Sequence, residues 1–199
     1  MTTPTQSAAG ATDTAYIANI LSTLATALVD RTERSTRMVL RPGAQAPAAL
    51  VSVLWYPDRP ISFLATRLQI SHPGAVQLVD RLQSDGLLER IPGADGRTKL
   101  LYLTDVGRAV ALRVLSSRRE AADTALRALD EQQVQALTAA AEAMLEALTD
   151  DLLDSEHMCR LCDELACPDS RCPVERAEPS PPNRRGFGYG VSSAQRERT

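Results

Sequence analysis

Hydrophobic positions along this chain recur mainly at the three- and four-residue spacing of amphipathic helices. The first such stretch is Ile17–Leu28, which predicts a helix that begins after Asp13 and ends before Arg41-Pro42-Gly43. The same spacing predicts helices at about 47–56, 61–68, 73–84, 105–129 and 131–153. Ser71, Thr104 and Asp130 are the expected N-caps of the last three. Two short apolar stretches, 87–91 and 100–104, predict strands, and the turn residues between them predict a hairpin.

Composition fits this mainly α pattern. Hydrophobic residues make up 44% of the 199 residues but aromatic residues only 4%, so the core must be built largely from Ala, Leu and Val. Ala and Leu are strong helix formers. No apolar run approaches 18 residues, and the first 13 residues lack the charged and apolar regions of a signal peptide. We therefore expect a cytoplasmic protein with no membrane partner.

The chain divides by composition into four segments. Residues 1–13 form a polar arm and residues 177–199 a tail rich in Pro, Gly, Arg and Ser, both of which we expect to be disordered. Residues 14–155 form the predicted helical domain, and residues 44–104 within it form the candidate DNA-binding core. A segment at 156–176 contains all four cysteines.

Charge is distributed unevenly around a net charge of −3. Residues 120–169 include thirteen acidic and two basic residues, whereas residues 60–113 include seven basic and five acidic residues. A surface for nucleic acid must therefore be local, and the acidic stretch is excluded from it.

The order helix, tight turn, helix and hairpin at 61–104 is that of a winged helix-turn-helix. Such a second helix fits the DNA major groove, and a hairpin that carries an arginine can reach the adjacent minor groove. Gln77 and Arg81 are expected to face outward from the second helix, and Arg97 stands at the hairpin turn. The expected inward positions of the second helix are Val76, Leu78, Val79 and Leu82.

The stretch from Phe63 to Arg90 resembles the core of the multiple-antibiotic-resistance regulator (MarR) family. Asp95-Gly96-Arg97 matches the family's Asp-x-Arg wing motif, and Leu103–Gly107 matches the Leu-Thr-x-x-Gly that opens its next helix. The resemblance covers about residues 17–153. It implies a homodimer joined by N- and C-terminal dimerisation helices and bound to a pseudo-palindromic double-stranded DNA operator, usually as a repressor.

The same resemblance implies which side chains contact DNA. It places five residues of the second helix and its cap in the major groove, and it places Arg97 in the minor groove with Asp95 orienting it. The five are Ser71, His72, Pro73, Gln77 and Arg81. A simpler interpretation stays open for each: Gln77 and Arg81 as solvated surface residues, and His72 as a capping-region residue that touches phosphate or water.

Four cysteines lie within fourteen residues in the pattern C-x2-C-x4-C-x4-C: Cys159, Cys162, Cys167 and Cys172. A reducing cytosol disfavours structural disulfides, so the pattern favours metal binding or redox chemistry. Four thiolates suit zinc or an iron–sulfur cluster. We expect one metal centre per subunit, with zinc preferred, an iron–sulfur cluster second and a metal-free thiol switch third. His157 is a spare ligand or a surface histidine, and the MarR pattern assigns no role to this segment.

The sequence leaves three functions to compare. The leading prediction is a DNA-binding transcription regulator that responds to metal or oxidant through the cysteines. The first alternative is the same regulator released by a small aromatic effector, with zinc as a structural clip. The second is a winged-helix protein-interaction module without DNA binding, against which Asp95 and Arg97 argue. An enzyme is not expected, because the sequence has no phosphate loop or Ser/His/Asp order and four thiolates would close a zinc site.

Overall fold

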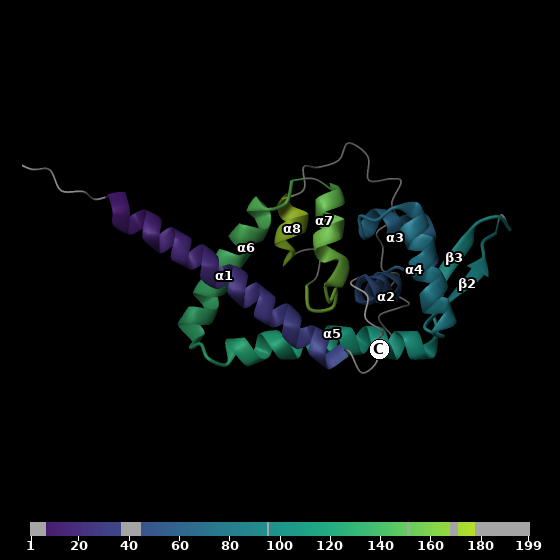
Figure 1. Cartoon of the computed structure of the whole chain (residues 1–199), viewed down its shortest axis with the longest axis horizontal. Helices are drawn as coiled ribbons and strands as arrows, with labels where there is room; N and C mark the ends of the chain where they lie inside the picture. The colour runs from purple at the N-terminus through teal and green to yellow at the C-terminus, as the bar shows by residue number, and fades with distance from the viewer. Residues whose placement is uncertain (1–6, 37–44, 95, 151, 168–170, 178–199) are drawn as a thin grey trace, which may run out of the picture.

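The computed structural model describes residues 7–36, 45–94, 96–150, 152–167 and 171–177, and within them the chain is mostly helical (Figure 1). The helices are α1 (Ser7–Thr36), α2 (Ala46–Trp55), α3 (Ile61–Arg67), α4 (His72–Ser84), α5 (Asp105–Leu126), α6 (Glu131–Ala147), α7 (Leu152–Met158) and α8 (Pro173–Ala177), with a 3-10 turn η1 (Cys159–Leu161). Three short strands, β1 (Arg59–Pro60), β2 (Leu88–Pro92) and β3 (Lys99–Leu103), form an antiparallel sheet in the order β1-β3-β2. The predicted mainly α winged helix-turn-helix fold is confirmed.

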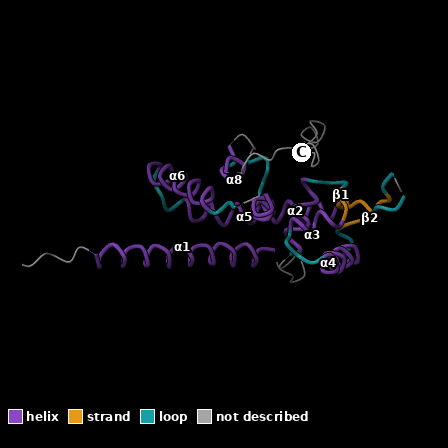
Figure 2. Tube along the Cα trace, turned by 90° about the horizontal axis from the view of Figure 1, so that it is seen from above, coloured by secondary structure: helices purple, strands orange, loops and turns teal. Residues whose placement is uncertain are grey.

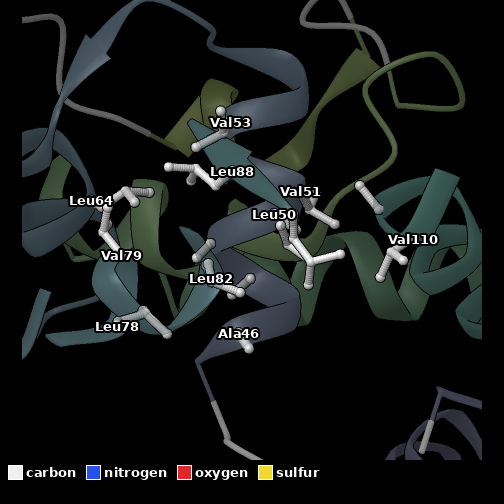
Figure 3. Packing of buried hydrophobic residues seen from close by; sticks show 14 of the residues in the cluster. Ala46, Leu50, Val51, Val53, Leu64, Leu78, Val79, Leu82, Leu88 and Val110 are labelled. Atoms are coloured by element: carbon white, nitrogen blue, oxygen red, sulfur yellow. The ribbon is translucent and has the colours of Figure 1, made fainter. Parts of the chain in front are cut away.

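One hydrophobic core joins α2, α3, α4, the sheet and the first half of α5. Helix α2 is apolar on nearly every side and buries seven of its ten residues. Figure 3 shows Leu50 of α2 at the centre of this cluster, with Leu64, Leu82 and Leu88 around it. Each of these leucines is almost fully buried. Truncation of such a side chain to Ala costs about 2–5 kcal/mol, so this core holds the helix-turn-helix in place.

Strand β1 lies in the segment 56–60, which the Pro-containing sequence predicts only as a break between helices. Asp58 adopts a φ of 60°, and its N–H donates a 3.1 Å hydrogen bond to the Leu101 carbonyl oxygen. Arg59 then pairs with Leu101. A two-residue strand is too short to show an alternation of apolar and polar residues. Strand β1 forms because it pairs with β3, which is distant in the sequence.

Helix α1 begins at Ser7, so the predicted boundary after Asp13 was wrong for residues 7–13. Residues 8, 9 and 11 are alanines, and the high helix propensity of Ala extends the helix toward the N-terminus. Helix α1 packs on α5 and runs past it as a long rod (Figure 1). Seen from above, α1 lies on one side of α5 while α6 and α8 lie on the other (Figure 2). The predicted stop at Arg41-Pro42-Gly43 falls outside the described residues.

The helix predicted at 131–153 is not continuous. Helix α6 ends at Ala147 with Leu148 as its C-cap, and α7 begins at Leu152. Thr149 and Asp150 lie between them, and both residue types have low helix propensity. The break returns the chain toward the core, where α7 packs on α3 and η1 packs on α2.

Candidate nucleic-acid interface and cysteine segment

The turn between α3 and α4 fixes the start of α4. Gln69 has a φ of 51°, and Ser71 is extended and caps α4 by accepting a 3.2 Å hydrogen bond from the Gly74 N–H to its hydroxyl oxygen. Pro73 lies in the first helical turn, where its missing N–H leaves no unsatisfied donor. The predicted N-cap is therefore confirmed, and it presents the first turn of α4 to solvent.

Helix α4 has one buried and one exposed face. Its buried residues are Ala75, Leu78, Val79 and Leu82. The expected inward position Val76 is only half-buried, and Ala75 takes its place because 75, 78, 79 and 82 follow the i, i+3, i+4, i+7 spacing of one helical face. The five residues assigned to the major groove are all exposed: Ser71, His72, Pro73, Gln77 and Arg81.

An ion pair ties α4 to the wing. The Arg90 guanidinium on β2 lies 2.7 Å from the Asp80 carboxylate, and its other terminal nitrogen donates a 3.0 Å hydrogen bond to the Gln83 side chain. Both acceptors belong to α4. The pair compensates the negative charge of Asp80, which stands next to Arg81 on the outward side of α4.

The hairpin of β2 and β3 projects from the core beside α4 (Figure 1). Its tip is closed by hydrogen bonds from the Gly93 N–H to the Thr98 carbonyl oxygen and from the Gly96 N–H to the Gly93 carbonyl oxygen, at 2.8 and 2.9 Å. Gly96 has a φ of 66°, a conformation that glycine adopts without strain. Arg97 follows it and is exposed. Asp95 lies outside the described residues, so its orienting role stays a prediction.

A tight junction holds the base of the wing against the end of α4. The Thr104 hydroxyl donates to the Gly86 carbonyl oxygen at 2.7 Å and accepts from the Gly107 N–H at 3.0 Å. A Cβ atom on Gly107 would lie 1.8 Å from the Leu87 carbonyl oxygen. The Leu-Thr-x-x-Gly motif is therefore needed for the cap and for the close crossing of α5 over Leu87.

The cysteine segment folds back onto the winged helix. Cys159 opens η1, Cys162 follows it, and Cys172 is buried just before α8, whereas Cys159, Cys162 and Cys167 are half-buried. Among the described residues, the structure has no group of three or more His, Cys, Asp or Glu side chains placed to hold a metal ion. The metal centre expected from the spacing stays a prediction.

The side chains of Cys159 and Cys162 are hydrogen-bonded to each other. The hydrogen bond from Cys159 lowers the pKa of Cys162 to about 7, and the nearby positive charges of Arg118 and Arg67 act in the same direction. The same hydrogen bond, together with burial and the charges of Cys162 and Cys172, raises the pKa of Cys159. Cys162 is therefore the more acidic thiol.

Two residues that the sequence analysis did not single out hold this segment. The Trp55 indole N–H donates a 3.0 Å hydrogen bond to the Cys162 carbonyl oxygen, and the Arg67 guanidinium donates a 3.3 Å bond to that of Cys159. The Nδ1 atom of His157, predicted as a spare ligand or a surface residue, lies 3.2 Å from the Arg67 carbonyl oxygen. The available signal was Arg67 itself, an arginine on the apolar side of α3 beside Leu64 and Leu68.

Solved structures with the MarR fold are similar to this chain. A MarR family protein from Bacillus stearothermophilus matches with a TM-score of 0.60 and 17% identity over 69% of this chain and 96% of that chain. The YusO protein of Bacillus subtilis matches with a TM-score of 0.57 and 18% identity over 71% of this chain and 98% of that chain. A mutant of MepR from Staphylococcus aureus bound to an oligodeoxyribonucleotide matches with a TM-score of 0.51 and 18% identity over 66% and 97%.

These likenesses confirm the fold that the sequence resemblance predicts, a winged helix-turn-helix of the MarR type. No protein-family model and no curated protein sequence matches this chain. Within the residues that the structure describes, no helix has the length and hydropathy needed to cross a membrane.

Proposed function

We propose that this protein is a homodimeric DNA-binding transcription regulator that represses by occupying a pseudo-palindromic operator. The observation that carries the proposal is the exposed polar face of α4, with Gln77 and Arg81 one turn apart, beside a wing whose tip exposes Arg97. The MepR mutant of similar fold was solved bound to an oligodeoxyribonucleotide, which supports the assignment.

The side chains on this face suit base recognition. Arginine reads guanine and glutamine reads adenine through paired hydrogen bonds in the major groove. His72 and Ser71 stand at the N-terminus of α4, where backbone N–H groups and the helix dipole favour phosphate. A narrow minor groove attracts an arginine such as Arg97. The exposed face of α4, the N-terminus of α4 and the tip of the wing together form the proposed interface for duplex DNA.

Two apolar stripes outside the core are proposed as the dimer interface. On α1, Tyr16 is 66% exposed, and Ile17, Ile20 and Leu24 are exposed on neighbouring turns. None of the 17 residues of α6 is buried, and Leu148 at its end is 67% exposed. Exposure of apolar stripes of this length to water is unfavourable. A second copy of the chain buries them in a symmetric dimer interface.

The cysteine segment is proposed as the regulatory part, with one metal centre per subunit held by Cys159, Cys162, Cys167 and Cys172. Thiolates suit zinc, which we prefer, and also an iron–sulfur cluster. Metal analysis and the absorption spectrum of protein purified without air separate the two: zinc with no visible absorption, or iron with absorption at about 400 nm.

A second candidate, release by a small effector, is favoured by one cavity. It measures about 470 Å³ and lies between α2, α5 and the cysteine segment. Its lining includes Trp55, Leu112, Arg113 and an ion pair of 4.0 Å between Arg119 and Asp163. An aromatic carboxylate would match the indole ring and the Arg113 guanidinium. Loss of DNA binding on addition of salicylate, with the cysteines unchanged, would favour this candidate over metal or oxidant.

DNA binding is tested with duplexes selected by this protein from a random pool. The Kd for the selected duplex is expected to rise steeply with salt, because phosphate contacts release counterions. Arg81→Ala is expected to cost about 1–3 kcal/mol and to relax specificity at one base pair in each half-site. Arg127→Ala, an exposed arginine beyond α5, serves as the control and leaves the Kd unchanged. Equal binding of every duplex by the wild type would overturn the proposal.

A further inference from the structure

We propose that Trp55 and Arg67 are positioning residues that dock the Cys159–Cys162 turn on the helix-turn-helix, so that the chemical state of these thiols sets the position of α3 and α4. The inference rests on the proposed function, since it names how that DNA-binding surface is regulated. The cysteine segment would then connect thiol chemistry to the DNA-binding helices through the contacts of these two residues.

The docked turn is held from two helices at once. Trp55 ends α2 and binds the Cys162 carbonyl oxygen at 3.0 Å, while Arg67 ends α3 and binds that of Cys159 at 3.3 Å. The backbone N–H of Cys162 also donates to the Cys159 carbonyl oxygen, which closes the turn. Leu161, between the two cysteines, packs against the hydrophobic core. Any change in the backbone of this turn therefore acts directly on the ends of α2 and α3.

Arg67 makes this contact sensitive to any shift of the turn's carbonyl groups. The residue is only 3% exposed, and its guanidinium carbon lies 4.7 Å from the ring centre of Tyr56 and 6.0 Å from that of Phe63. Its Nε atom is buried without a hydrogen-bond partner among the described residues. A buried cation is costly unless it is paired. Arg67 is stabilised instead by the Cys159 carbonyl oxygen, to which it donates at 3.3 Å, and by the faces of the two aromatic rings.

Oxidation of the two thiols changes the turn that Arg67 and Trp55 hold. A hydroperoxide converts Cys159 and Cys162 to a disulfide: the S–S bond forms, the O–O bond breaks, and the two thiol hydrogens leave in the water and the alcohol that result. The S–S bond fixes the separation and orientation of the two cysteines, so the backbone of the turn must change. The carbonyl oxygens that accept from Trp55 and Arg67 then move, and the loss of an acceptor for the buried Arg67 favours undocking.

The segment is anchored at its other end to α6. Arg176 of α8 lies 2.6 Å from Glu146 and 3.4 Å from Glu142, both on α6. Helices α7 and α8 lie between α6 and the α2–α3 pair, with α8 in contact with α6 and α7 in contact with α3 (Figure 1). Since α6 is the proposed dimerisation helix, docking fixes each α4 relative to its partner in the dimer. Undocking changes the spacing between the two DNA-reading helices.

Trp55 provides the test, because it is the only tryptophan in the sequence. The reduced full-length protein is treated with hydrogen peroxide, and free thiols, tryptophan emission, acrylamide quenching and Kd for the selected duplex are measured together. We expect emission at longer wavelength, stronger quenching and a change in Kd of about five- to 150-fold, the usual range of coupling between two sites. A Cys159→Ser, Cys162→Ser double variant is expected to show neither response.

Arg67→Met separates a coupling role from a merely structural one. Loss of stability alone would raise the Kd of the reduced and oxidised forms equally, whereas loss of coupling brings their ratio close to one. Trp55→Phe keeps an aromatic ring, removes the donor, and is expected to reduce the same ratio, which keeps the test open if Arg67→Met fails to fold. Oxidised thiols with unchanged Trp55 emission would overturn the docking proposal and leave DNA binding intact. An emission shift without specific DNA binding under any condition would instead overturn the proposed function.

Discussion

Arg90 of β2 and Asp80 of α4 form an ion pair of 2.7 Å that joins the wing to the helix beside it. Arg90 is mostly covered and Asp80 mostly exposed. The two elements proposed to enter adjacent grooves are therefore connected by a side-chain contact as well as through the core.

Loss of this pair is expected to weaken DNA binding without unfolding the protein. Arg90→Met leaves the Asp80 charge uncompensated on the outward side of α4, where it repels phosphate. We expect a loss of about 1 kcal/mol in binding, the scale of a partly exposed pair. A double-mutant cycle with Asp80→Asn, read by fluorescence anisotropy, checks this. We expect Asp80→Asn to restore the affinity of the Arg90→Met variant, whereas an additive cycle would show that the pair has no role in DNA binding.

Gly107 is expected to be intolerant of any side chain. In Gly107→Ala the Cβ would lie 1.8 Å from the Leu87 carbonyl oxygen, so backbone must move. We expect the free energy of unfolding in urea to fall by about 1–3 kcal/mol or more. Gly74→Ala is the matched control, because its Cβ would meet only the Ser71 hydroxyl at 3.2 Å. Equal stability of the two variants would contradict the close approach of α5 to Leu87 at Gly107.

The apolar stripes of α1 and α6 predict a dimer at micromolar concentration. Leu24→Arg places a charge in the α1 stripe and is expected to shift the sedimentation coefficient toward that of the monomer. Leu165→Arg is the control, since Leu165 is 58% exposed but lies on neither helix. A wild-type monomer at this concentration would remove the dimer and, with it, the palindromic operator.

The two paired thiols are expected to react with different pH dependence in the metal-free, reduced protein. The pKa of Cys162 is lowered to about 7 by its hydrogen bond from Cys159 and by Arg118 and Arg67. Only thiolates react with iodoacetamide. The alkylation rate of Cys162 should therefore rise as the pH passes 7 and level off above it, while Cys159, whose pKa is raised, stays unreactive over this range.

Peptide mass spectrometry after timed alkylation measures both sites. In guanidinium chloride the hydrogen bond and the proximity of the arginines are lost, so the two cysteines should become equally reactive, each with a pKa of about 8.5. Equal rates in the folded protein would show that the pair does not interact.

Features that depend on neighbours in the sequence were predictable. Ser71 and Thr104 cap the helices they were expected to cap, and Asp130 forms a capping box with Gln133, with bonds of 2.8 and 3.0 Å. An N-cap joins residues that lie within four positions of each other, so the local sequence determines it. The exposed face of α4 was predictable from helical periodicity, which is also a local property. The one difference is that Ala75 is buried where Val76 was expected.

Features set by distant contacts were not predictable. Strand β1 exists because Arg59 meets Leu101, and the break after α6 lets α7 reach α3. Trp55 and Arg67 contact the cysteine turn across 107 and 92 residues of sequence. Trp55 lies outside every motif. Arg67 lies within the Phe63–Arg90 stretch, where an arginine on the apolar side of a helix, beside Leu64, was the one sign of a partner.

Selection from a random duplex pool tests whether α4 and the wing read DNA sequence. Wild-type protein and Arg97→Ala are each given the same pool, and bound duplexes are sequenced over several rounds. The account predicts that the wild type enriches an inverted repeat with half-sites about one helical turn apart. It also predicts that Arg97→Ala retains the repeat but loses preference in the A·T-rich flanks and about 1–3 kcal/mol of affinity. A wild-type pool that stays as random as the input would contradict the assignment of α4 and the wing as a DNA-reading surface.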